Sequence, residues 1–363
     1  MNFTIFSVVR RYWQIAFGLP LFFFGCAGMQ AKPEAKVYNE IECMFLDHEG
    51  KVVYKFPGAR CQFFPDGSFV AGMETWLRMT GPDGAVTWSY AMDTHHQINL
   101  GAGGKEILAM SSSIHKYQKR MVRFDRLVIY DRAGKLLRYF DYFDHLSAIK
   151  EKLSILQSGS LYTIDKSGPA THVPNYVEYE FSHANSFHEI GENATGREYP
   201  AFAKGNYLVN DLGRGSFVLD SKLEKILWWM SFGSDVHDVQ ILEDGWLLLY
   251  RNEQPILMGK KFTTIEKVHP ITGQRKILYR ADPPESFYSD QCGGVQMLEN
   301  GNMLISEIGN GGKAVELTPS GKRVWEINYP FINPKTKRPD LYQQVKRYDL
   351  TDFLKNHRGV SWF

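Results

Sequence analysis

The feature that most constrains the fold of this chain is a pair of short strand patterns that recur along it. The first pattern is a turn followed by an apolar run that ends in an aromatic residue, and it occurs at 50–54, 84–88, 134–139, 224–228, 273–279 and 321–325. The second pattern is an apolar hairpin around a Gly-containing turn, at 61–72, 95–110, 237–250 and 293–306. Alternating apolar residues on both sides of a tight turn are typical of β-hairpins.

Together the two patterns predict roughly four strands for every 35 to 55 residues, which is the size of one blade of a β-propeller. Six aromatic-ended runs indicate six blades, while five or seven stay open because strands from both ends of the chain can share the last blade. Helical periodicity is nearly confined to a short insertion at 145–156. We therefore expect an all-β protein in which residues 39–363 form one propeller domain.

The first 26 residues have the pattern of an export signal. Arg10 and Arg11 precede an almost wholly apolar run at 13–24, which ends in Gly25-Cys26. The run is shorter than the roughly 20 residues that a membrane-spanning helix needs. We expect lipidation of Cys26 after cleavage, with 27–38 as a linker; an ordinary secretory signal and an uncleaved anchor are the alternatives. The prediction is an exported protein on the periplasmic face of a bacterial envelope.

Charge and cysteine content exclude several classes of function. The formal net charge is only +2, so there is no strong electrostatic case for nucleic acid as a partner. If Cys26 is lipidated, three cysteines remain, and Cys43 and Cys61 lie in successive predicted strands where an oxidising compartment would permit a bridge. No Cys-x-x-Cys or Cys/His spacing typical of zinc sites occurs.

Three histidines occupy matching places in the repeat. His95 and His237 each lie five residues before a leucine in the second pattern, and His183 begins the corresponding strand in the unit that carries the insertion. In a propeller the first strand of each blade lines the central channel, so these side chains should meet at one mouth of the channel. Converging imidazoles can bind a metal, bind an oxyanion, or supply a nucleophile or base. Alternatively, each histidine simply packs in the channel and hydrogen-bonds a neighbouring blade.

With these histidines in place, the chain resembles the bacterial arylsulfotransferases that use no nucleotide sulfate donor. The matching stretches include THHQI at 94–98, DRLVIYD at 125–131, SHANS at 182–186, VHDVQ at 236–240 and GVQMLENGN at 294–302. Shorter matches continue to 345–348, so the resemblance covers roughly residues 40–350 in order. The resemblance implies a six-bladed propeller that needs no metal and no other cofactor.

The resemblance also implies roles for individual residues. It makes His237 the nucleophile, which takes a sulfuryl group from an aryl sulfate ester and passes it to a phenol. It places sulfuryl-binding groups at His95 or His96, His183 and Asn185, and a hydroxyl near the end of the next inner strand at Ser306. The alignment of the repeats favours His95 over His96.

Two departures from the family pattern narrow what can be carried over. The family arginine that follows the Leu-Val strand has no direct counterpart, because Asn210-Asp211-Leu212 stands there and Arg214 comes about two positions late. The separate N-terminal β domain of some members has no room before the first blade. The alternatives are therefore a non-catalytic envelope propeller that binds an anionic small molecule or a protein, and a metal-dependent hydrolase or lyase that uses the same histidines.

Overall fold

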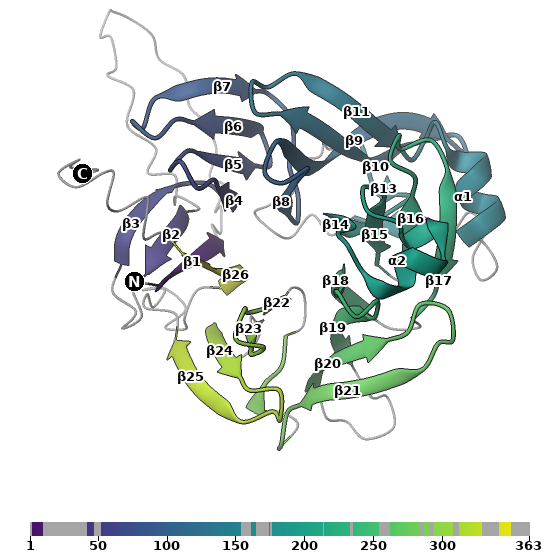
Figure 1. Cartoon of the computed structure of the whole chain (residues 1–363). Helices are drawn as coiled ribbons and strands as arrows, with labels where there is room; N and C mark the ends of the chain where they lie inside the picture. Colours follow the sequence, from purple (N-terminus) through teal and green to yellow (C-terminus); the bar gives the residue numbers. More distant parts are fainter. Residues whose placement is uncertain are drawn as a thin grey trace, which may run out of the picture.

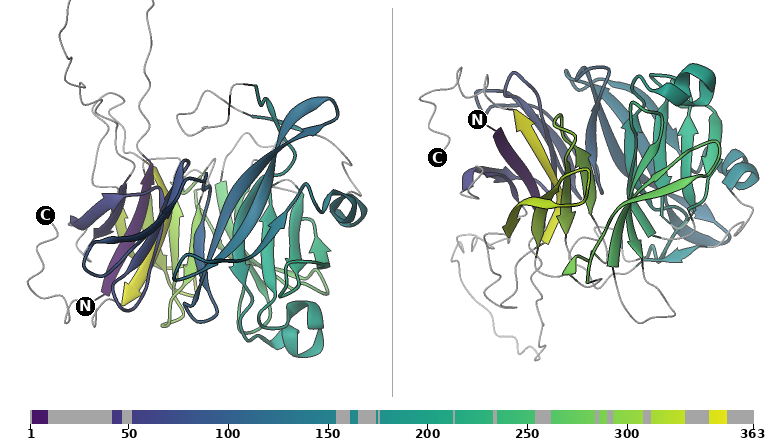
Figure 2. Two further views of the ribbon diagram at one scale, coloured as in Figure 1. Left: turned by 90° about the horizontal axis from the view of Figure 1, so that it is seen from above. Right: turned by 60° about the horizontal axis from the view of Figure 1, so that its bottom comes forward.

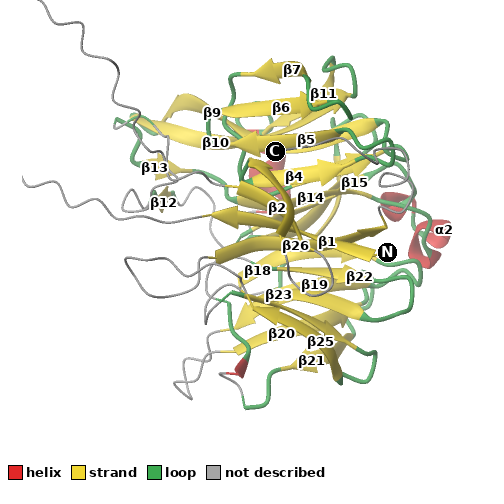
Figure 3. Ribbon diagram, turned by 90° about the vertical axis from the view of Figure 1, so that its left-hand side faces the viewer, coloured by secondary structure: helices red, strands yellow, loops and turns green. Residues whose placement is uncertain are grey.

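A computed structural model of the chain describes residues 2–9, 42–46, 52–153, 161–164, 174, 176–212, 214–232, 235–253, 262–283, 286–289, 293–307, 312–328 and 341–349. The described strands form six sheets, five of four strands and one of six. The sheets stand side by side around a common axis (Figure 1), with few helices at their margins (Figure 3). The expected all-β propeller architecture is confirmed.

Four of the sheets are meanders whose first strand lies nearest the axis (Figure 1). In three four-stranded sheets the strands follow one another in chain order. The first contains β4 (Arg60–Phe63), β5 (Phe69–Met73), β6 (Trp76–Thr80) and β7 (Val86–Tyr90), and the second contains β14 (Ala184–Glu189), β15 (Tyr207–Asp211), β16 (Gly215–Leu219) and β17 (Ile226–Met230). The third contains β18 (Asp235–Ile241), β19 (Leu247–Glu253), β20 (Phe262–Val268) and β21 (Arg275–Arg280). A fourth consists of β22 (Gly294–Met297), β23 (Met303–Glu307), β24 (Lys313–Leu317) and β25 (Arg323–Asn328).

The six-stranded sheet is the irregular one. It contains β8 (Ile98–Gly101), β9 (Glu106–Tyr117), β10 (Arg120–Asp131), β11 (Leu136–Asp141), β12 (Tyr162–Thr163) and β13 (Tyr179–Glu180). The β9–β10 hairpin is long and rises above the other strands in Figure 2. The predicted helical insertion is α1 (Leu146–Leu153), and α2 (Ala194–Glu198) and η1 (Pro200–Phe202) are the other helical turns described.

The remaining sheet joins the two ends of the chain. Its order is β26 (Leu341–Asp349), β1 (Asn2–Val9), β2 (Glu42–Leu46) and β3 (Val52–Pro57). Strand β1 pairs antiparallel with both β26 and β2. The sharing of one sheet by both chain ends, which the sequence had left open, is therefore observed.

The two sequence patterns correspond to two layers of the ring. The aromatic-ended runs are the outermost strands β3, β7, β11, β17, β21 and β25, and the second pattern gives the inner hairpins β4–β5, β8–β9, β18–β19 and β22–β23. Glycines at their turns, such as Gly245 and Gly301, have positive φ angles of 82° and 79°. A side chain is rarely accommodated there, so glycine at these turns is required by the backbone.

Apolar side chains fill the spaces between neighbouring sheets. The described residues form six buried clusters, and each takes its residues from two adjacent sheets. The cluster between the sheet that both chain ends share and the β22–β25 sheet includes Met44, Leu46, Val345, Leu304 and Ala314. Removal of this apolar surface from water is the main force that holds the sheets together. The ring is thus closed by packing on every side.

Polar side chains of the inner strands add a second closure along the axis. Each inner strand donates a side-chain amide to a backbone carbonyl of the next, with the following pairs: Gln62 to Ile98 at 2.7 Å, Asn99 to Phe187 at 2.9 Å, Asn185 to Val236 at 2.7 Å, Gln240 to Val295 at 2.8 Å, and Gln296 to Arg347 at 3.0 Å. The Tyr348 hydroxyl returns the chain of contacts to Gln62. These bonds fix the register of the inner strands, and hence of the residues that precede them.

Two other expectations concern the chain ends and the cysteines. Cys26 lies outside the described residues, and so does the predicted export signal except for β1, residues 2–9. Among the described helices, none is long and apolar enough to span a membrane. Cys43 and Cys61 pack in one buried cluster, and no disulfide joins these two described residues.

Candidate functional site

The predicted histidines meet at one mouth of the ring. The rings of His95 and His96 contact each other edge-on with centroids 5.2 Å apart, and His96 and His183 do so at 4.7 Å. His237 directly follows Val236, whose carbonyl accepts the Asn185 side chain from the strand that begins after His183, and it is close enough to contribute to the lowered pKa of His96. We call these four side chains the imidazole cluster. The cluster combines residues from the starts of three inner strands, β8, β14 and β18 (Figure 1).

His95 is fixed by an acid and a carbonyl from the neighbouring strands. Its Nε2 lies 3.1 Å from Oδ1 of Asp125 and 2.9 Å from the carbonyl oxygen of Ser111, so the proton on this nitrogen has two acceptors. Asp125 also accepts the Ala184 N–H at 2.6 Å. Burial alone would raise the pKa of Asp125, but the hydrogen bond and charge of His95, together with the Arg123 charge and the Ala184 N–H, outweigh it, and the pKa lies well below the usual range. His95 is therefore held rigidly, and its Nδ1 is buried with no hydrogen-bond partner.

His183 is held as a donor by a second acid. Its Nδ1 lies 2.7 Å from Oε1 of Glu180, and Arg123 binds the other Glu180 oxygen at 3.3 Å. Burial would lower the pKa of His183, but the hydrogen bond and charge of Glu180 outweigh it, so the pKa is raised. The His183 backbone N–H donates to Asp211 at 3.0 Å. At this mouth His183 is therefore a ring whose charged form is favoured by Glu180.

His237 lies at the end of a buried relay of hydrogen bonds. The Ser289 N–H donates to the Thr263 hydroxyl at 3.0 Å, and that hydroxyl donates to Oδ1 of Asn252 at 3.1 Å. Asn252 then presents its Nδ2 to Nδ1 of His237 at 2.9 Å. Since an amide nitrogen is only a donor, this arrangement leaves the neutral His237 ring with its proton on Nε2. His237 is 6% exposed.

His96 differs from the other three rings. Its backbone has φ = 54°, in the left-handed region that few non-glycine residues adopt. No hydrogen bond to its ring is found among the described residues. Burial lowers the pKa of His96 well below 6.5, and the repulsion of positive charge on the surrounding groups, His183 first among them, adds to the effect. The centre of the cluster is therefore an imidazole that resists protonation.

The other predicted site residues are engaged within the fold. Asn185, on β14, donates to the Val236 carbonyl and accepts from Asn210 at 2.7 Å, so it braces the strand that carries His237. Arg214 lies 3.5 Å from the buried Asp211 and its guanidinium stacks on Phe181, 4.6 Å from the ring centroid. Arg214 is thus adjacent to the His183 segment and is neutralised there by Asp211.

Ser306 was predicted near the end of an inner strand, and the structure places it on the neighbouring strand instead. It lies on β23, the second strand of its sheet, and its hydroxyl accepts the Gly294 N–H at 3.0 Å. The inner strand of this sheet is only four residues long and turns back after Met297, so Ser306 belongs to the returning strand. Ser306 is completely buried.

Several residues that fix the cluster were not predicted as site residues. They are Arg60, Arg123, Asp125, Glu180, Asn252 and Thr263. Glu180 could have been found, since it stands three residues before His183, but Asp125 and Asn252 come from second and third strands whose alignment with the histidines depends on the register of each sheet. His188, another channel histidine, bonds Asp238 at 3.0 Å, further along the axis from the cluster.

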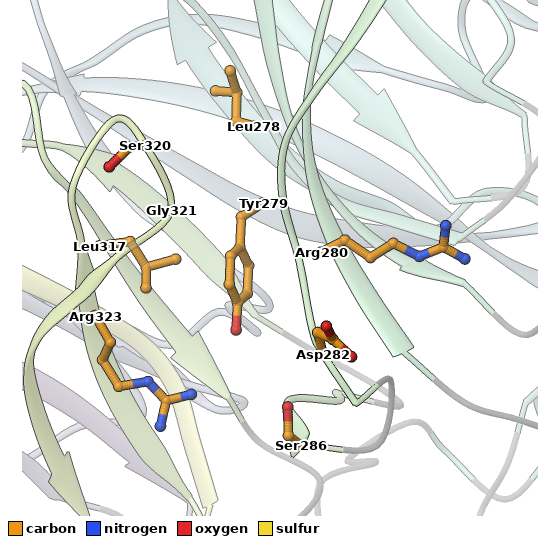
Figure 4. Close-up of a pocket in the computed structure, with 9 residues that line it drawn as sticks. All are labelled: Leu278, Tyr279, Arg280, Asp282, Ser286, Leu317, Ser320, Gly321 and Arg323. Atoms are coloured by element: carbon orange, nitrogen blue, oxygen red, sulfur yellow. The ribbon is translucent and has the colours of Figure 1, made fainter.

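Two other kinds of site were sought in the described part of the chain. No group of three or more His, Cys, Asp and Glu side chains converges there in a way that could hold a metal ion. A cavity of about 380 Å³ lies between β21 and the β24–β25 turn and is lined by Tyr279, Asp282, Ser286 and Arg323, among others (Figure 4). It contains none of the predicted site residues, and Arg323 is paired with Glu326.

The fold and the imidazole cluster together define a β-propeller with a polar site at one mouth of its axis. No family model matches this chain, and no curated protein matches it. Among solved structures, a protein of unknown function from Bacteroides caccae is similar over 96% of this chain and 99% of its own, with 11% identity and a TM-score of 0.56.

Two further propeller structures show weaker likeness. The Cps50 (Swd1) β-propeller domain of Myceliophteria thermophila matches over 80% of each chain, with 10% identity and a TM-score of 0.47. U3-55K matches over 78% of this chain and 69% of its own, with 9% identity and a TM-score of 0.43. At such identities the likeness concerns the fold alone.

Proposed function

We propose that this protein is an arylsulfotransferase-like enzyme, which transfers a sulfuryl group from an aryl sulfate ester to a phenolic acceptor through a covalent histidine intermediate. The observation that carries the proposal is the imidazole cluster: His95, His96, His183 and His237, far apart in sequence, meet at one mouth of the ring. No nucleotide and no cofactor are required. The sequence resemblance names His237 as the catalytic histidine, with the others and Asn185 as sulfuryl-binding groups.

The charges around the cluster suit an anionic ester. A sulfate monoester carries one negative charge on its terminal oxygens, and this charge shifts as the bond to the aryl oxygen breaks. The His183 ring, the Nε2–H of His237 and the Arg60 guanidinium provide donors or positive charge around His96. Donors already in place for such charge stabilise the transition state without reorganising during the reaction.

We further propose the setting of this enzyme. Each of the six sheets would count as one blade, with the sheet built from both chain ends as the last. The N-terminal segment would direct export and Cys26 would carry the lipid, so the membrane would be contacted only by that segment. Aryl sulfates and phenols outside the cytoplasm would be the substrates.

The proposal is tested by incubating the purified protein with an aryl sulfate and a phenol and measuring transfer by chromatography. We expect transfer that falls by at least about 100-fold in His237→Ala and persists in His269→Gln, a control at the surface turn between β20 and β21. His269 accepts backbone N–H groups of its own turn and is remote from the cluster in sequence and sheet position. Full transfer by His237→Ala would refute the role of this residue, and absence of transfer by the wild type with a range of phenols would refute the function.

A non-catalytic propeller that binds an anionic small molecule is the second candidate. It is favoured by Arg214, whose charge is already met by Asp211 and whose plane is covered by Phe181. If the family arginine must be free for catalysis, such a site would retain affinity for the anion but not activity. Binding of an aryl sulfate by calorimetry, without any transfer, would identify this case.

A further inference from the structure

Four imidazoles meet in the cluster, and covalent transfer needs only one nitrogen lone pair at the sulfur atom. The proposed function therefore requires that one of the four rings offers this lone pair to the sulfur atom. The hydrogen bonds of the cluster bear directly on which ring this is, because a ring nitrogen that carries a proton or accepts a hydrogen bond is not available as a nucleophile.

Three rings have at least one nitrogen held by a hydrogen bond. Nε2 of His95 faces the Asp125 carboxylate and the Ser111 carbonyl, and its other nitrogen is buried inside the protein. Nδ1 of His183 donates to Glu180, which also raises the pKa of this ring. An acid thus holds each of these two rings through one nitrogen, as suits groups that orient the substrate or donate to it.

His237 is committed through its relay. The backbone N–H of Ser289 can only donate, so the Thr263 oxygen accepts it and the Thr263 proton is directed at Oδ1 of Asn252. With its oxygen used in this way, Asn252 turns its NH₂ group toward Nδ1 of His237. The lone pair of Nδ1 is thereby taken, and Nε2 carries the proton as a donor.

His96 has the opposite properties. The residue is partly exposed, its ring makes no hydrogen bond to any described residue, and the ring contacts those of His95 and His183. Its backbone is left-handed, with φ = 54°. Non-glycine residues in this region cluster at functional sites, where surrounding structure holds them in place.

Resting on the proposed function, we infer that His96 is the nucleophile that carries the sulfuryl group, and that His237 is a donor to the sulfuryl oxygens. In the first step a His96 nitrogen forms a bond to sulfur while the bond from sulfur to the aryl oxygen breaks, and its electron pair leaves on the phenolate. In the second step the acceptor, as its phenolate, forms a bond to sulfur, the sulfur–nitrogen bond breaks, and its electron pair returns to His96. The sum exchanges one phenolate for another on the same sulfuryl group.

The surroundings of His96 suit the second step in particular. Neighbouring positive charges and burial disfavour a proton on this ring, so its nitrogen binds the sulfuryl group less tightly than an ordinary imidazole would. A less basic nitrogen is a better leaving group for the acceptor to displace. The same charges hold the sulfuryl oxygens, so they offset the weaker attack in the first step.

The experiment maps the covalent intermediate in the full chain. The protein is mixed with 4-nitrophenyl sulfate without acceptor, quenched in alkali, digested with trypsin, and its peptides are sequenced by mass spectrometry. Peptide 79–105 contains both His95 and His96, whereas peptide 226–251 contains His237, so cleavage after Arg78, Lys105, Lys225 and Arg251 separates the alternatives. We expect one added sulfuryl group on 79–105, located on His96 by fragmentation.

Two variants extend the test to rates. His96→Gln should lose the label and reduce transfer by about 1000-fold, whereas His237→Gln should keep the label on His96 and slow transfer by about 100-fold, as expected for loss of one donor. The wild-type peptide map needs neither variant to fold. A label on His237 or His95 would overturn the inference while leaving the proposed function intact; transfer without any label would overturn the covalent step; and neither transfer nor label would overturn both proposals.

Discussion

Asp125→Asn is the substitution that tests the construction of the cluster most directly. Asp125 is 1% exposed and accepts two donors, Nε2–H of His95 and the Ala184 N–H. An asparagine side chain has one oxygen and one NH₂ group, so one of these donors would face another donor. Loss of the buried Asp125 charge, together with one unsatisfied donor, should lower the free energy of unfolding by about 3 kcal/mol.

The same substitution should change the titration of His183. The charge of Asp125 is one of the contributions that raise the pKa of His183, although Glu180 contributes more. We therefore expect the pKa of His183 to fall in Asp125→Asn while His183 keeps its contact with Glu180. Urea unfolding followed by tryptophan fluorescence measures the first effect, and histidine titration by NMR measures the second.

Asp141→Asn is the matched control. Asp141 is also 1% exposed on the same sheet and accepts from Ser113, Phe143 and Arg126, but it has no contact with the cluster. It should cost a similar unfolding free energy and leave His183 unchanged. If Asp125→Asn is as stable as the wild type to within about 0.5 kcal/mol, or if both variants shift His183 equally, the role assigned to Asp125 is wrong.

Three further expectations follow from two buried charged side chains and from the sheet that joins the two ends of the chain. Burial raises the pKa of Asp211 from 3.8 to about 6, so the ionisation of Asp211 opposes folding. Relative to Asp211→Asn, the wild type should lose about 2.4 kcal/mol of stability as the pH rises from 4 to 7, measured by urea unfolding at each pH, and a constant difference would contradict this. Burial lowers the pKa of Lys346 to about 8, so the full cost of its charge is present below pH 8 and is lost as the pH rises toward 10.5. Because Lys346 is partly exposed and still donates to Asn99 at 2.8 Å, Lys346→Met should stabilise the protein by only about 1–2 kcal/mol at pH 7. Destabilisation by this substitution at pH 7 would show that the charge is compensated. Processing at Cys26 would remove β1 from between β26 and β2, so the exported form should expose the edge of β2 to faster amide hydrogen exchange than the full-length chain, with unchanged exchange as the contrary result.

Much of the ring could be predicted because local sequence patterns specify its strands and turns. Apolar alternation and glycine turns specify each hairpin without reference to the others, and the aromatic-ended runs proved to be the outer strand of every sheet. The meeting of His95, His183 and His237 followed from the same reasoning, since equivalent positions in successive sheets of a ring lie around one axis. The choice between His95 and His96 did not follow, because the left-handed turn between them is set by tertiary contacts.

The partners of the histidines were harder to predict for a related reason. Asp125 reaches His95 from β10, two strands out from the axis, and Asn252 reaches His237 from β19. Which residue of an outer strand faces the start of an inner one depends on register, and a shift of one residue turns its side chain to the other face of the sheet. The observed pairings include bulges, such as the one between Val236 and Asp238, that displace His237 from simple alternation. No spacing in the sequence reports such a bulge.

The tandem histidines show how one repeat position can acquire two tasks. In the repeat, the residue before the inner strand has room for one buried side chain, and His95 fills it because Asp125 and the Ser111 carbonyl neutralise and orient the ring there. A second histidine in extended backbone would point to the opposite side of the strand. The left-handed conformation of His96 instead turns it back toward His183, so both rings lie at the same mouth. Rigidity is then supplied by His95 and an accessible lone pair by His96, two properties that a single histidine held by Asp125 could not combine.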